Sequence, residues 1–303
     1  MRMAMVGLGR MGGNMARRLR RGGIEVVGFN RTARVTAELA AEVGVISAST
    51  LVEAVGLLRS PRVMWLMLPA GEATEQGIRE ILPFLAPGDV IVDGGNAWYK
   101  DSKRRGAWLA EQGIGFVDAG TSGGVWGLNN GYCMMVGGDA RDVALIEPLL
   151  KVLAPAEDKG WGHVGPVGAG HFVKMIHNGI EYGMMQALAE GFALLRGNAA
   201  FGVDVAQVEE LWRHSSVVRS WLLDLSATVL AEDANLRDVA PVVADSGEGR
   251  WTVLESVEQG VAAPVLALAL QMRFASRDAE GYGNRLLAMM RNAFGGHEIT
   301  EKK

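Results

Sequence analysis

One stretch of the sequence, residues 171–195 (HFVKMIHNGIEYGMMQALAEGFALL), combines an apolar helical pattern with side chains that can transfer protons. Counted from Lys174, the residues His177, Asn178, Glu181 and Tyr182 fall at +3, +4, +7 and +8. This spacing predicts a single polar stripe along an α-helix. The pattern therefore raises the question of why a lysine, a histidine and a glutamate lie on a helix that is otherwise filled with apolar residues.

Whether this polar stripe is buried or faces water decides whether its lysine and glutamate are suited to proton transfer. Desolvation lowers the pKa of a lysine and raises that of a glutamate, so that both become suited to proton transfer near neutral pH. The alternative is a water-facing stripe on an ordinary amphipathic helix. We expect burial, because the other faces carry apolar residues: Ile176, Ile180, Met184 and Ala187.

The elements that position this helix follow from the alternation of apolar runs and helical patterns over residues 2–150. Alternation of this kind predicts βαβ units and a mainly parallel, twisted sheet. Six runs read as strands: RMAMVG, IEVVGF, RVMWLML, DVIVDGG, IGFVDAG and YCMMVGG. Helices are expected near residues 12–21, 33–43, 72–85, 100–112 and 140–153. After Gly165 the remaining chain reads as nearly all helix, which predicts a Rossmann-type α/β domain over residues 1–165 and an all-α domain over residues 166–303.

A glycine-rich turn follows the first predicted strand, in MVGLGRMGGNMARRL. Gly7, Gly9 and Gly12 form G-x-G-x-x-G, which at this place in a βαβ unit predicts a dinucleotide site. The free N–H groups of the following helix would then face the pyrophosphate. The candidate cofactor residues here are Gly7, Leu8, Gly9, Arg10, Met11 and Gly12. Since the polar helix follows this domain, we expect it to border the cofactor cleft.

The end of the second predicted strand indicates which dinucleotide binds. An NAD site commonly has an acidic residue there, whereas this chain has Asn30, Arg31 and Thr32. Arg31 can pair with a 2′-phosphate and stack on adenine. The sequence therefore favours NADP over NAD, with Arg31 as a solvated loop residue of an NAD enzyme as the alternative.

Bulk properties narrow the class of protein. A formal net charge of −4 argues against a general nucleic-acid binder. One cysteine, Cys133, excludes an internal disulfide and suits a reducing cytoplasm; its strand-like context predicts a core position. No membrane span, signal peptide or metal site is predicted, and the chain is expected to act on a small molecule without nucleic-acid or membrane partners.

Several motifs resemble the decarboxylating 6-phosphogluconate dehydrogenases of the β-hydroxyacid dehydrogenase superfamily, and the length of 303 residues suggests their short-chain form. The most specific is KMIHNGIEY, which matches the family's K-x-x-H-N-G-x-E-Y helix. The match covers nearly the whole chain and includes DGGN ending at Asn96, SGG at 122–124, GPVGAGHFVK, GRWT and FGGH.

The resemblance implies oxidative decarboxylation of 6-phosphogluconate to ribulose 5-phosphate with reduction of NAD(P). It implies that Lys174 removes the proton of the 3-hydroxyl and later donates to the carbonyl oxygen, and that Glu181 protonates C1 of the enediol. His177 and Asn178 would hydrogen-bond the reacting hydroxyl and its neighbours. Such an enzyme would serve a pentose-phosphate route or gluconate utilisation.

The resemblance also implies a set of substrate contacts and an oligomer. Asn96 would touch both substrate and nicotinamide, and Ser122, Gly123 and Gly124 would hold the carboxylate end. Tyr182 and Arg273 match phosphate ligands. Arg291 and His297 match tail residues that reach the site of a neighbouring subunit, which implies a homodimer or homotetramer.

One loop departs from the family pattern. Long-form members have K-G-T-G-K-W-T where this chain has SGEGRWT, so that Ser246 and Glu248 replace a lysine and a threonine. A glutamate beside a phosphate is repulsive. The details of phosphate recognition are therefore open, whereas the chemistry is not affected.

Two other readings remain. A 3-hydroxyisobutyrate-type β-hydroxyacid dehydrogenase shares the fold and the lysine but oxidises without obligatory decarboxylation, and it lacks HNGIEY. A catalytically silent NADP-binding sensor would be indicated by loss of the lysine or the glutamate, and both are present.

Overall fold

The structure, a computed structural model, describes residues 1–295 and 298–300 and divides into two compact units, Met1–Asn178 and Gly179–Lys303. The first unit contains a sheet of eight strands in the order β3-β2-β1-β4-β5-β6-β7-β8. All neighbouring strands are parallel except β6 and β7, which are antiparallel. The predicted mainly parallel sheet is confirmed, and its first six positions have the order of a dinucleotide-binding fold.

The strands of this sheet are β1 (Arg2–Val6), β2 (Glu25–Phe29), β3 (Ile46–Ser47), β4 (Val63–Leu66), β5 (Val90–Asp93), β6 (Gly115–Ser122), β7 (Cys133–Gly137) and β8 (Trp161–Gly165). The helices between them are α1 (Arg10–Arg21), α2 (Ala33–Val43), α3 (Leu51–Gly56), α4 (Glu72–Ile81), η1 (Leu82–Phe84), α5 (Tyr99–Ala110), η2 (Gly124–Trp126), α6 (Gly127–Asn130) and α7 (Ala140–Leu153). Every predicted strand and helix of this unit is present.

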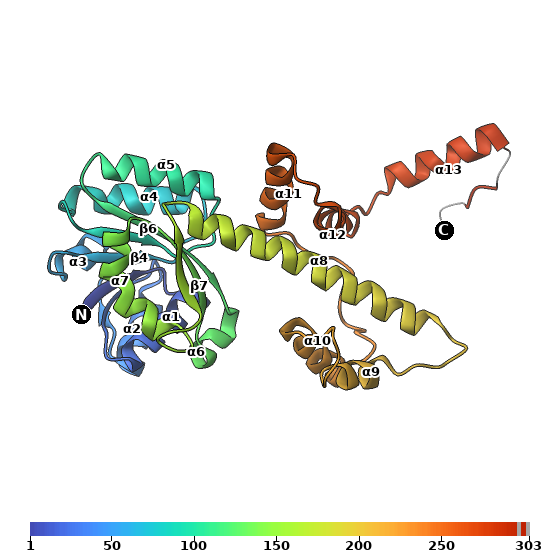
Figure 1. Cartoon of the computed structure of the whole chain (residues 1–303), viewed down its shortest axis with the longest axis horizontal. Coiled ribbons are helices and arrows are strands. Elements are labelled where there is room, and N and C mark those ends of the chain that lie inside the picture. The colour runs from blue at the N-terminus through green and yellow to red at the C-terminus, as the bar shows by residue number, and fades with distance from the viewer. Residues whose placement is uncertain (296–297, 301–303) are drawn as a thin grey trace. The chain divides into compact units, whose positions relative to one another are not determined.

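Helices cover both faces of the sheet, with α1 and α2 on one side and α4 and α5 on the other (Figure 1). Alternate residues of β1 enter opposite cores, since successive side chains of a strand point to opposite faces. Met3 and Met5 pack with the α1 side, whereas Ala4 and Val6 pack with the other side. Burial on both faces explains why these strands are continuous apolar runs in the sequence.

The second half of the chain is helical, as predicted. Its helices are α8 (Ala169–Gly197), α9 (Val205–Trp212), α10 (Trp221–Glu232), α11 (Glu248–Gln259), α12 (Pro264–Ala275) and α13 (Tyr282–Gly295). The side chains of Asp204 and Ser220 accept the N3 amide hydrogens of α9 and α10, and Pro264 opens α12. The division between the compact units falls within α8, because the first turns of this helix pack on β6 and β7.

Three features differ from the sequence-based expectations or add to them. The expected core position of Cys133 is wrong, since it is exposed as the first residue of β7, where the alternation turns its neighbour Met134 inward. Ile180 and Met184 are also exposed, at 51% and 42%, so the second unit alone does not surround α8 with apolar contacts. Within the described residues, no helix is both long enough and apolar enough to cross a membrane.

Candidate active site

The glycine turn lies between the end of β1 and the start of α1, and each glycine has a separate physical reason. Gly7 has φ +88°, and a Cβ there would lie 2.5 Å from the carbonyl oxygen of Met67. A Cβ at Gly12 would lie 2.0 Å from the carbonyl oxygen of Gly7, so this glycine lets α1 pack closely on the turn. A Cβ at Gly9, in contrast, would meet no described atom within 4 Å. The open side of Gly9 fits a dinucleotide pyrophosphate.

The position of this turn also suits a dinucleotide. The order of the chain reverses between β1 and β4, and ligands of such sheets bind outside the carboxyl ends of the strands at this switch point. Of the other candidates in the turn, Leu8 is buried in the core at 3% exposure and so offers only its backbone to a ligand, whereas Arg10 is exposed and Met11 is half-buried.

The three candidates after β2 have different environments. The side chain of Asn30 forms two hydrogen bonds to backbone groups of the protein. Its Oδ1 accepts the Leu8 amide hydrogen at 3.0 Å, and its Nδ2 donates to the Thr32 carbonyl at 3.3 Å. Asn30 thus ties the glycine turn to the loop that follows β2. Arg31 and Thr32 are both exposed, and Arg31 makes no ion pair with any residue that the structure describes.

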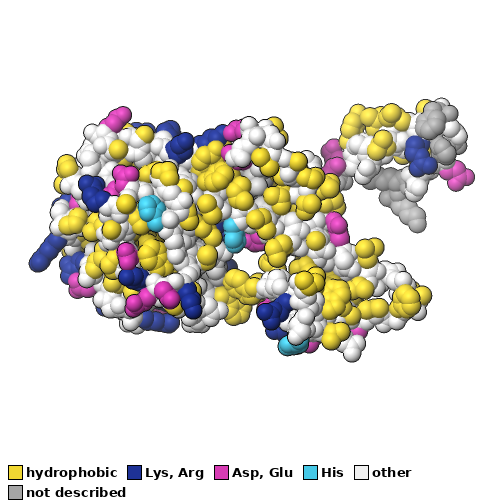
Figure 2. All heavy atoms as spheres, in the orientation of Figure 1, with side chains coloured by type: hydrophobic (Ala, Val, Ile, Leu, Met, Phe, Trp, Pro, Cys, Tyr) yellow, Lys and Arg dark blue, Asp and Glu magenta, His cyan; other side chains and the backbone are white. Residues whose placement is uncertain are grey.

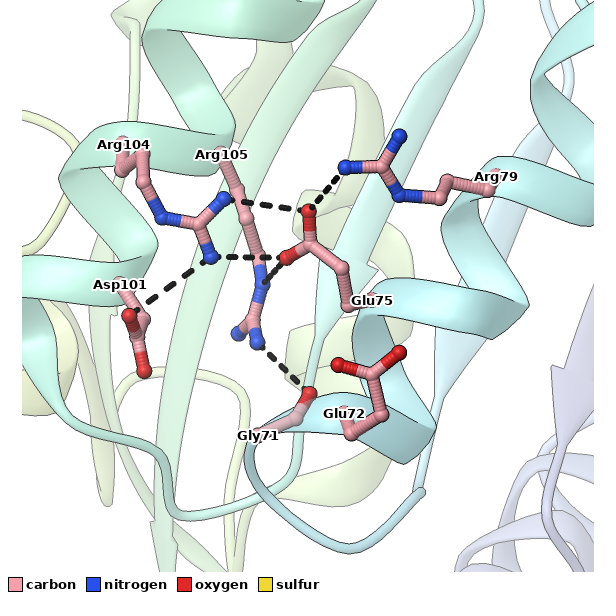
Figure 3. Close-up of a pocket in the computed structure, with 7 residues that line it drawn as sticks. All are labelled: Gly71, Glu72, Glu75, Arg79, Asp101, Arg104 and Arg105. Carbon is pink, nitrogen blue, oxygen red and sulfur yellow. Dashed lines mark hydrogen bonds and ion pairs between the residues drawn. The ribbon is translucent and has the colours of Figure 1, made fainter.

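An arginine that the sequence did not single out holds the loops after β4 and β5. Arg105 is fully buried; it donates to the Gly71 carbonyl at 3.0 Å, and its guanidinium is 3.2 Å from Glu75 (Figure 3). The guanidinium is also 3.2 Å from Asp93 at the end of β5. Hydrogen bonds from Arg104 and Arg105, together with their charges, lower the pKa of Glu75 to about 2. Burial raises the pKa of Asp93 to about 7, against the opposing effect of Arg105.

The pocket in Figure 3, of about 360 Å³, is lined by this network. Its three arginines are matched by three carboxylates, Glu72, Glu75 and Asp101, which makes it a structural ion-pair cluster rather than an anion site. Because Arg105 binds both the Gly71 carbonyl and Asp93, the cluster fixes the turn at Gly71 relative to the end of β5.

The first turns of α8 bring three of the predicted chemical residues together. Lys174 is buried at 4% exposure, and its Nζ donates to Asn178 Oδ1 at 2.6 Å. His177 Nδ1 lies 3.3 Å from the same nitrogen and 3.0 Å from Asn178 Oδ1. The lysine stem packs directly on β6, because a Cβ at Gly120 of that strand would lie 2.4 Å from the Lys174 Cβ.

The loops after β5 and β6 contribute the next residues. Asn96 donates from Nδ2 to the Thr121 carbonyl at 3.3 Å and accepts the Thr121 amide hydrogen at 3.1 Å, so its side chain is held at the end of β6. Ser122 Oγ lies 3.5 Å from His177 Nε2. Gly123 and Gly124 have φ values of +126° and +51°, which only glycine adopts readily. The predicted SGG loop therefore adjoins the histidine of α8.

The arrangement can move a proton. Lys174 Nζ has a half-buried acceptor in Asn178, a histidine nitrogen within hydrogen-bonding distance, and a serine hydroxyl beyond that histidine. A neutral amine held in this way can accept a proton from a substrate hydroxyl, and the resulting ammonium has partners that stabilise it.

The predicted phosphate residues of the second unit also lie together. The guanidinium of Arg273 stacks 3.5 Å from the centre of the Tyr182 ring, and its Nη1 donates to the Ala244 carbonyl at 2.6 Å. Ser246 Oγ is 3.4 Å from the Tyr182 hydroxyl and donates to Glu248 Oε2 at 2.5 Å. The side chain of Glu248 is thus directed toward Ser246 and is buried at 8% exposure.

The remaining predicted residues are less constrained by the structure. Glu181 lies on α8 in the second unit and is half-buried. Arg291 is exposed on α13, and the predicted His297 lies outside the described residues.

Comparison with known proteins gives the family. A model described as the NAD binding domain of 6-phosphogluconate dehydrogenase matches residues 2–165, and one described as the C-terminal domain of 6-phosphogluconate dehydrogenase matches residues 170–288. The chain belongs to the 6-phosphogluconate dehydrogenase family. The resemblance inferred from the sequence motifs is confirmed, as is a fold with a Rossmann-like sheet followed by a helical domain.

Members of the 6-phosphogluconate dehydrogenase family match along the entire chain. A putative 6-phosphogluconate dehydrogenase of Bacillus subtilis is 41% identical over 303 residues, which is 100% of both chains. A decarboxylating, NAD(+)-dependent 6-phosphogluconate dehydrogenase of Haloferax volcanii is 38% identical over 100% of this chain and 99% of its own. The decarboxylating enzyme of Synechococcus elongatus is 35% identical over 90% of this chain, which spans only 61% of that longer protein.

Solved structures show the same fold. The 6-phosphogluconate dehydrogenase of Plasmodium falciparum, described in complexes with NADP+ and with 6-phosphogluconate, aligns with a TM-score of 0.84 at 28% identity, over 100% of this chain and 66% of its own. A 3-hydroxyisobutyrate dehydrogenase of Mycobacterium tuberculosis aligns with a TM-score of 0.73 at 23% identity, over 92% of this chain and 94% of its own. The second likeness concerns the fold alone.

Proposed function

We propose that this chain is an NAD(P)-dependent 6-phosphogluconate dehydrogenase that oxidises and decarboxylates 6-phosphogluconate to ribulose 5-phosphate and carbon dioxide. The single observation that carries the proposal is the buried Lys174, held by Asn178 at 2.6 Å in a chain of this family. Relatives along the full length that are named for this reaction support it.

Lys174 is the general base of the oxidation. Its Nζ takes the proton of the substrate's 3-hydroxyl while Asn178 and His177 hold the amine in place. A nicotinamide cofactor bound at the glycine turn would supply the acceptor for the hydride that leaves the same carbon. Lys174 is then protonated and donates to the new 3-carbonyl oxygen, which favours loss of the neighbouring carboxylate as carbon dioxide.

Glu181 completes the reaction as the general acid. Loss of carbon dioxide leaves an enediol, whose C1 requires a proton to give ribulose 5-phosphate. Glu181 lies seven residues after Lys174 on the same helix, two turns along one stripe, which suits delivery of a proton at a second carbon of the same short molecule.

The substrate and cofactor ligands follow from the positions already described. Ser122, Gly123 and Gly124 hold the carboxylate end, and Asn96 contacts both the substrate and the nicotinamide. Tyr182 with Arg273 binds the phosphate. The glycine turn, from Gly7 to Gly12, holds the pyrophosphate, and Arg31 faces a 2′-phosphate. Relatives carry both cofactor names, NAD(+)-dependent and NADP(+)-dependent, so the preference for NADP rests on Arg31.

The active form is a homodimer or homotetramer in which residues 1–165 bind the dinucleotide and residues 166–303 bind substrate and form the subunit contact. Figure 2 shows apolar side chains over the helical part of the chain. Large apolar residues there are strongly exposed, among them Leu194, Phe201, Leu211, Val265 and Leu268 at 63–79%. A second copy that covers them would also receive the tail with Arg291 and His297. We place the enzyme in the cytoplasm.

A substrate comparison tests the proposal against the other β-hydroxyacid dehydrogenases. Reduction of NADP and NAD is followed at 340 nm with 6-phosphogluconate, gluconate and 3-hydroxyisobutyrate as separate substrates. We expect kcat/KM for 6-phosphogluconate to exceed that for the other two by at least about a thousandfold, since loss of a bound, charged group removes several kcal/mol. Comparable rates with 3-hydroxyisobutyrate would reject the proposal, and no rate with any substrate would favour a silent NADP-binding protein.

A further inference from the structure

A carboxylate of the central sheet caps the helix that carries Lys174. Asp118 lies in the middle of β6 with 0% exposure. Its Oδ1 accepts the amide hydrogen of Gly168 at 2.6 Å, and its Oδ2 accepts that of His171 at 2.7 Å. The first amide groups of a helix have no carbonyl partner within the helix. Here a residue fifty positions earlier in the chain supplies both acceptors.

The start of α8 packs so closely on β6 and β7 that no side chain fits between the helix and the strands. A Cβ at Gly170 would lie 2.3 Å from the Asp118 carbonyl oxygen and 2.5 Å from that of Met135. A Cβ at Gly137 would lie 2.6 Å from both Asp118 Oδ1 and the Gly170 nitrogen. Backbone therefore meets backbone at this contact. Side-chain interdigitation cannot set the register of the helix here, so the register depends on directed hydrogen bonds.

We propose that Asp118 is a positioning residue for the reaction, which fixes the register of α8 on β6 and thereby sets where the Lys174 amine lies. The two amide groups that it accepts precede Lys174 by six and three residues, so a slip of the first turn moves the lysine directly. The lysine Cβ already lies against Gly120, two residues after Asp118 on the same strand.

A second anchor in the same turn restricts rotation of the helix. The ring of His171 is fully buried, and its Nδ1 lies 2.7 Å from Ser102 Oγ of α5. The amide of His171 is held by β6 while its side chain is held by α5. The helix start is thus fixed from two elements of the sheet domain, and Asp118 is the one that contacts the backbone.

Asp118→Asn and Asp118→Ala test this role, with Asp89→Asn as a matched control. Asp89 is also 0% exposed and accepts two amide hydrogens, those of Arg62 at 2.7 Å and Ala86 at 2.9 Å, together with a bond from the Arg62 guanidinium at 2.9 Å. It directly precedes β5, at the amino end of that strand. An asparagine at 118 keeps the shape of the side chain and turns an NH2 group toward one of the two N–H donors. The Asp118 variants and the Asp89→Asn control should therefore all lose stability, but only the Asp118 variants should lose catalytic activity.

We expect both Asp118 variants to lower kcat about 10- to 100-fold, since a displacement of a catalytic group by about 1 Å has effects of this size. KM for the nicotinamide cofactor should stay within about twofold, because the glycine turn is untouched. Asp89→Asn should lower the midpoint of thermal unfolding to a similar extent and leave kcat within about twofold. Equal loss of kcat in the control and in Asp118→Asn, or an unchanged kcat in both Asp118 variants, would overturn the proposal.

Two further measurements do not depend on turnover, which matters because the inference rests on the proposed role of Lys174. Amide hydrogen exchange of the unmodified protein should show Gly168 and His171 protected as strongly as the interior of α8; rapid exchange at both would overturn the proposal even if the variants do not fold. Acylation of Lys174, followed by peptide mapping, should be at least about tenfold faster in Asp118→Asn than in the parent, and no change relative to the half-exposed Lys151 would count against it. A protein that passes both tests but does not oxidise 6-phosphogluconate would refute the proposed function alone.

Discussion

The Lys174 amine lies 2.6 Å from Asn178 Oδ1, one turn further along the same helix, in surroundings that leave the lysine 4% exposed. The acceptor is a neutral amide, so this hydrogen bond orients the amine without itself adding a negative charge that would retain the proton. A carboxylate at position 178 would instead hold the proton on the lysine by charge attraction. The pairing thus suits an amine that must release and regain a proton in each turnover.

Replacing the lysine tests its role as the base. Lys174→Met keeps an apolar stem of similar length and removes the amine, and we expect kcat to fall by roughly two to four orders of magnitude. Binding of the reduced cofactor, measured by fluorescence titration, should stay within about twofold, since the glycine turn lies elsewhere on the sheet. Turnover near that of the parent would remove Lys174 from this role.

Glu181→Gln should affect the second half of the reaction. The amide cannot donate a proton as an acid does, so exchange of solvent tritium into C1 of ribulose 5-phosphate should slow by at least about a hundredfold. Glu190→Gln is a suitable control, because Glu190 is an exposed glutamate of the same helix that accepts a hydrogen bond from Gln186. Unchanged exchange in Glu181→Gln would assign the acid to another group.

Arg31→Ala tests the cofactor preference. Charge-assisted hydrogen bonds to a phosphate contribute about 1.5–3 kcal/mol, so KM for NADP should rise roughly 10- to 100-fold while KM for NAD changes little. The matched control is Arg34→Ala, which removes another exposed arginine, one that pairs with Glu38 at 3.1 Å. Equal losses for the two cofactors would contradict the assignment of Arg31.

Glu248→Gln tests the loop that departs from the family pattern. Its carboxylate accepts a hydrogen bond from Ser246, which lies beside the Tyr182 hydroxyl, so its charge opposes a phosphate bound there. Removing the charge should lower KM for 6-phosphogluconate roughly two- to tenfold, as expected for one like charge a few ångströms away. KM for gluconate, which has no phosphate, serves as the control. The same change for both substrates would place the phosphate elsewhere.

The ion-pair cluster around Glu75 predicts a pH-dependent stability. The folded protein holds the pKa of Glu75 at about 2, below its usual 4.5, mainly through the hydrogen bond from Arg104. A lowered pKa stabilises the fold above the unfolded value, and this contribution is lost as the pH falls from 4.5 toward 2. Solvent screening of the half-exposed Arg104 reduces the effect to about 1–3 kcal/mol at pH 7.

Urea unfolding of the parent and of Glu75→Gln at several pH values measures this contribution. The free-energy difference between them should be largest near pH 7 and shrink steadily below pH 4.5. Parallel curves for the two proteins over that range would show that the Glu75 carboxylate does not gain its charge stabilisation from folding.

The fold could be predicted largely because parallel strands buried on both faces leave continuous apolar runs. Elements too short to leave such a signal were missed. Strand β3 has two residues, and α3 has six. Strand β8 leaves no such signal either, because Trp161–Gly165 contains two glycines and none of its residues is buried. Cys133 was misplaced because a strand of five residues does not by itself reveal which face its first residue occupies.

The site could be predicted where its residues share one local period. The stripe on α8 depends on helical spacing alone, and the glycine turn depends on three positions within one loop. Asp118 and Arg105 were missed, because a single aspartate in VDAG or an arginine within a basic helix has no local signature. Their roles depend on contacts with Gly168, His171 and Gly71 that only the folded chain provides. An aspartate inside an apolar strand was the one available signal, since a buried carboxylate requires partners.

The ratio of carbon dioxide released to cofactor reduced, with 6-phosphogluconate as substrate, tests the central claim most directly. If Lys174 and the family's chemistry act as proposed, each molecule of NAD(P)H is accompanied by one molecule of carbon dioxide and one of ribulose 5-phosphate, and Lys174→Met lowers the rates of formation of all three together. Cofactor reduction without carbon dioxide would identify a β-hydroxyacid dehydrogenase that stops at the keto acid and would contradict the account.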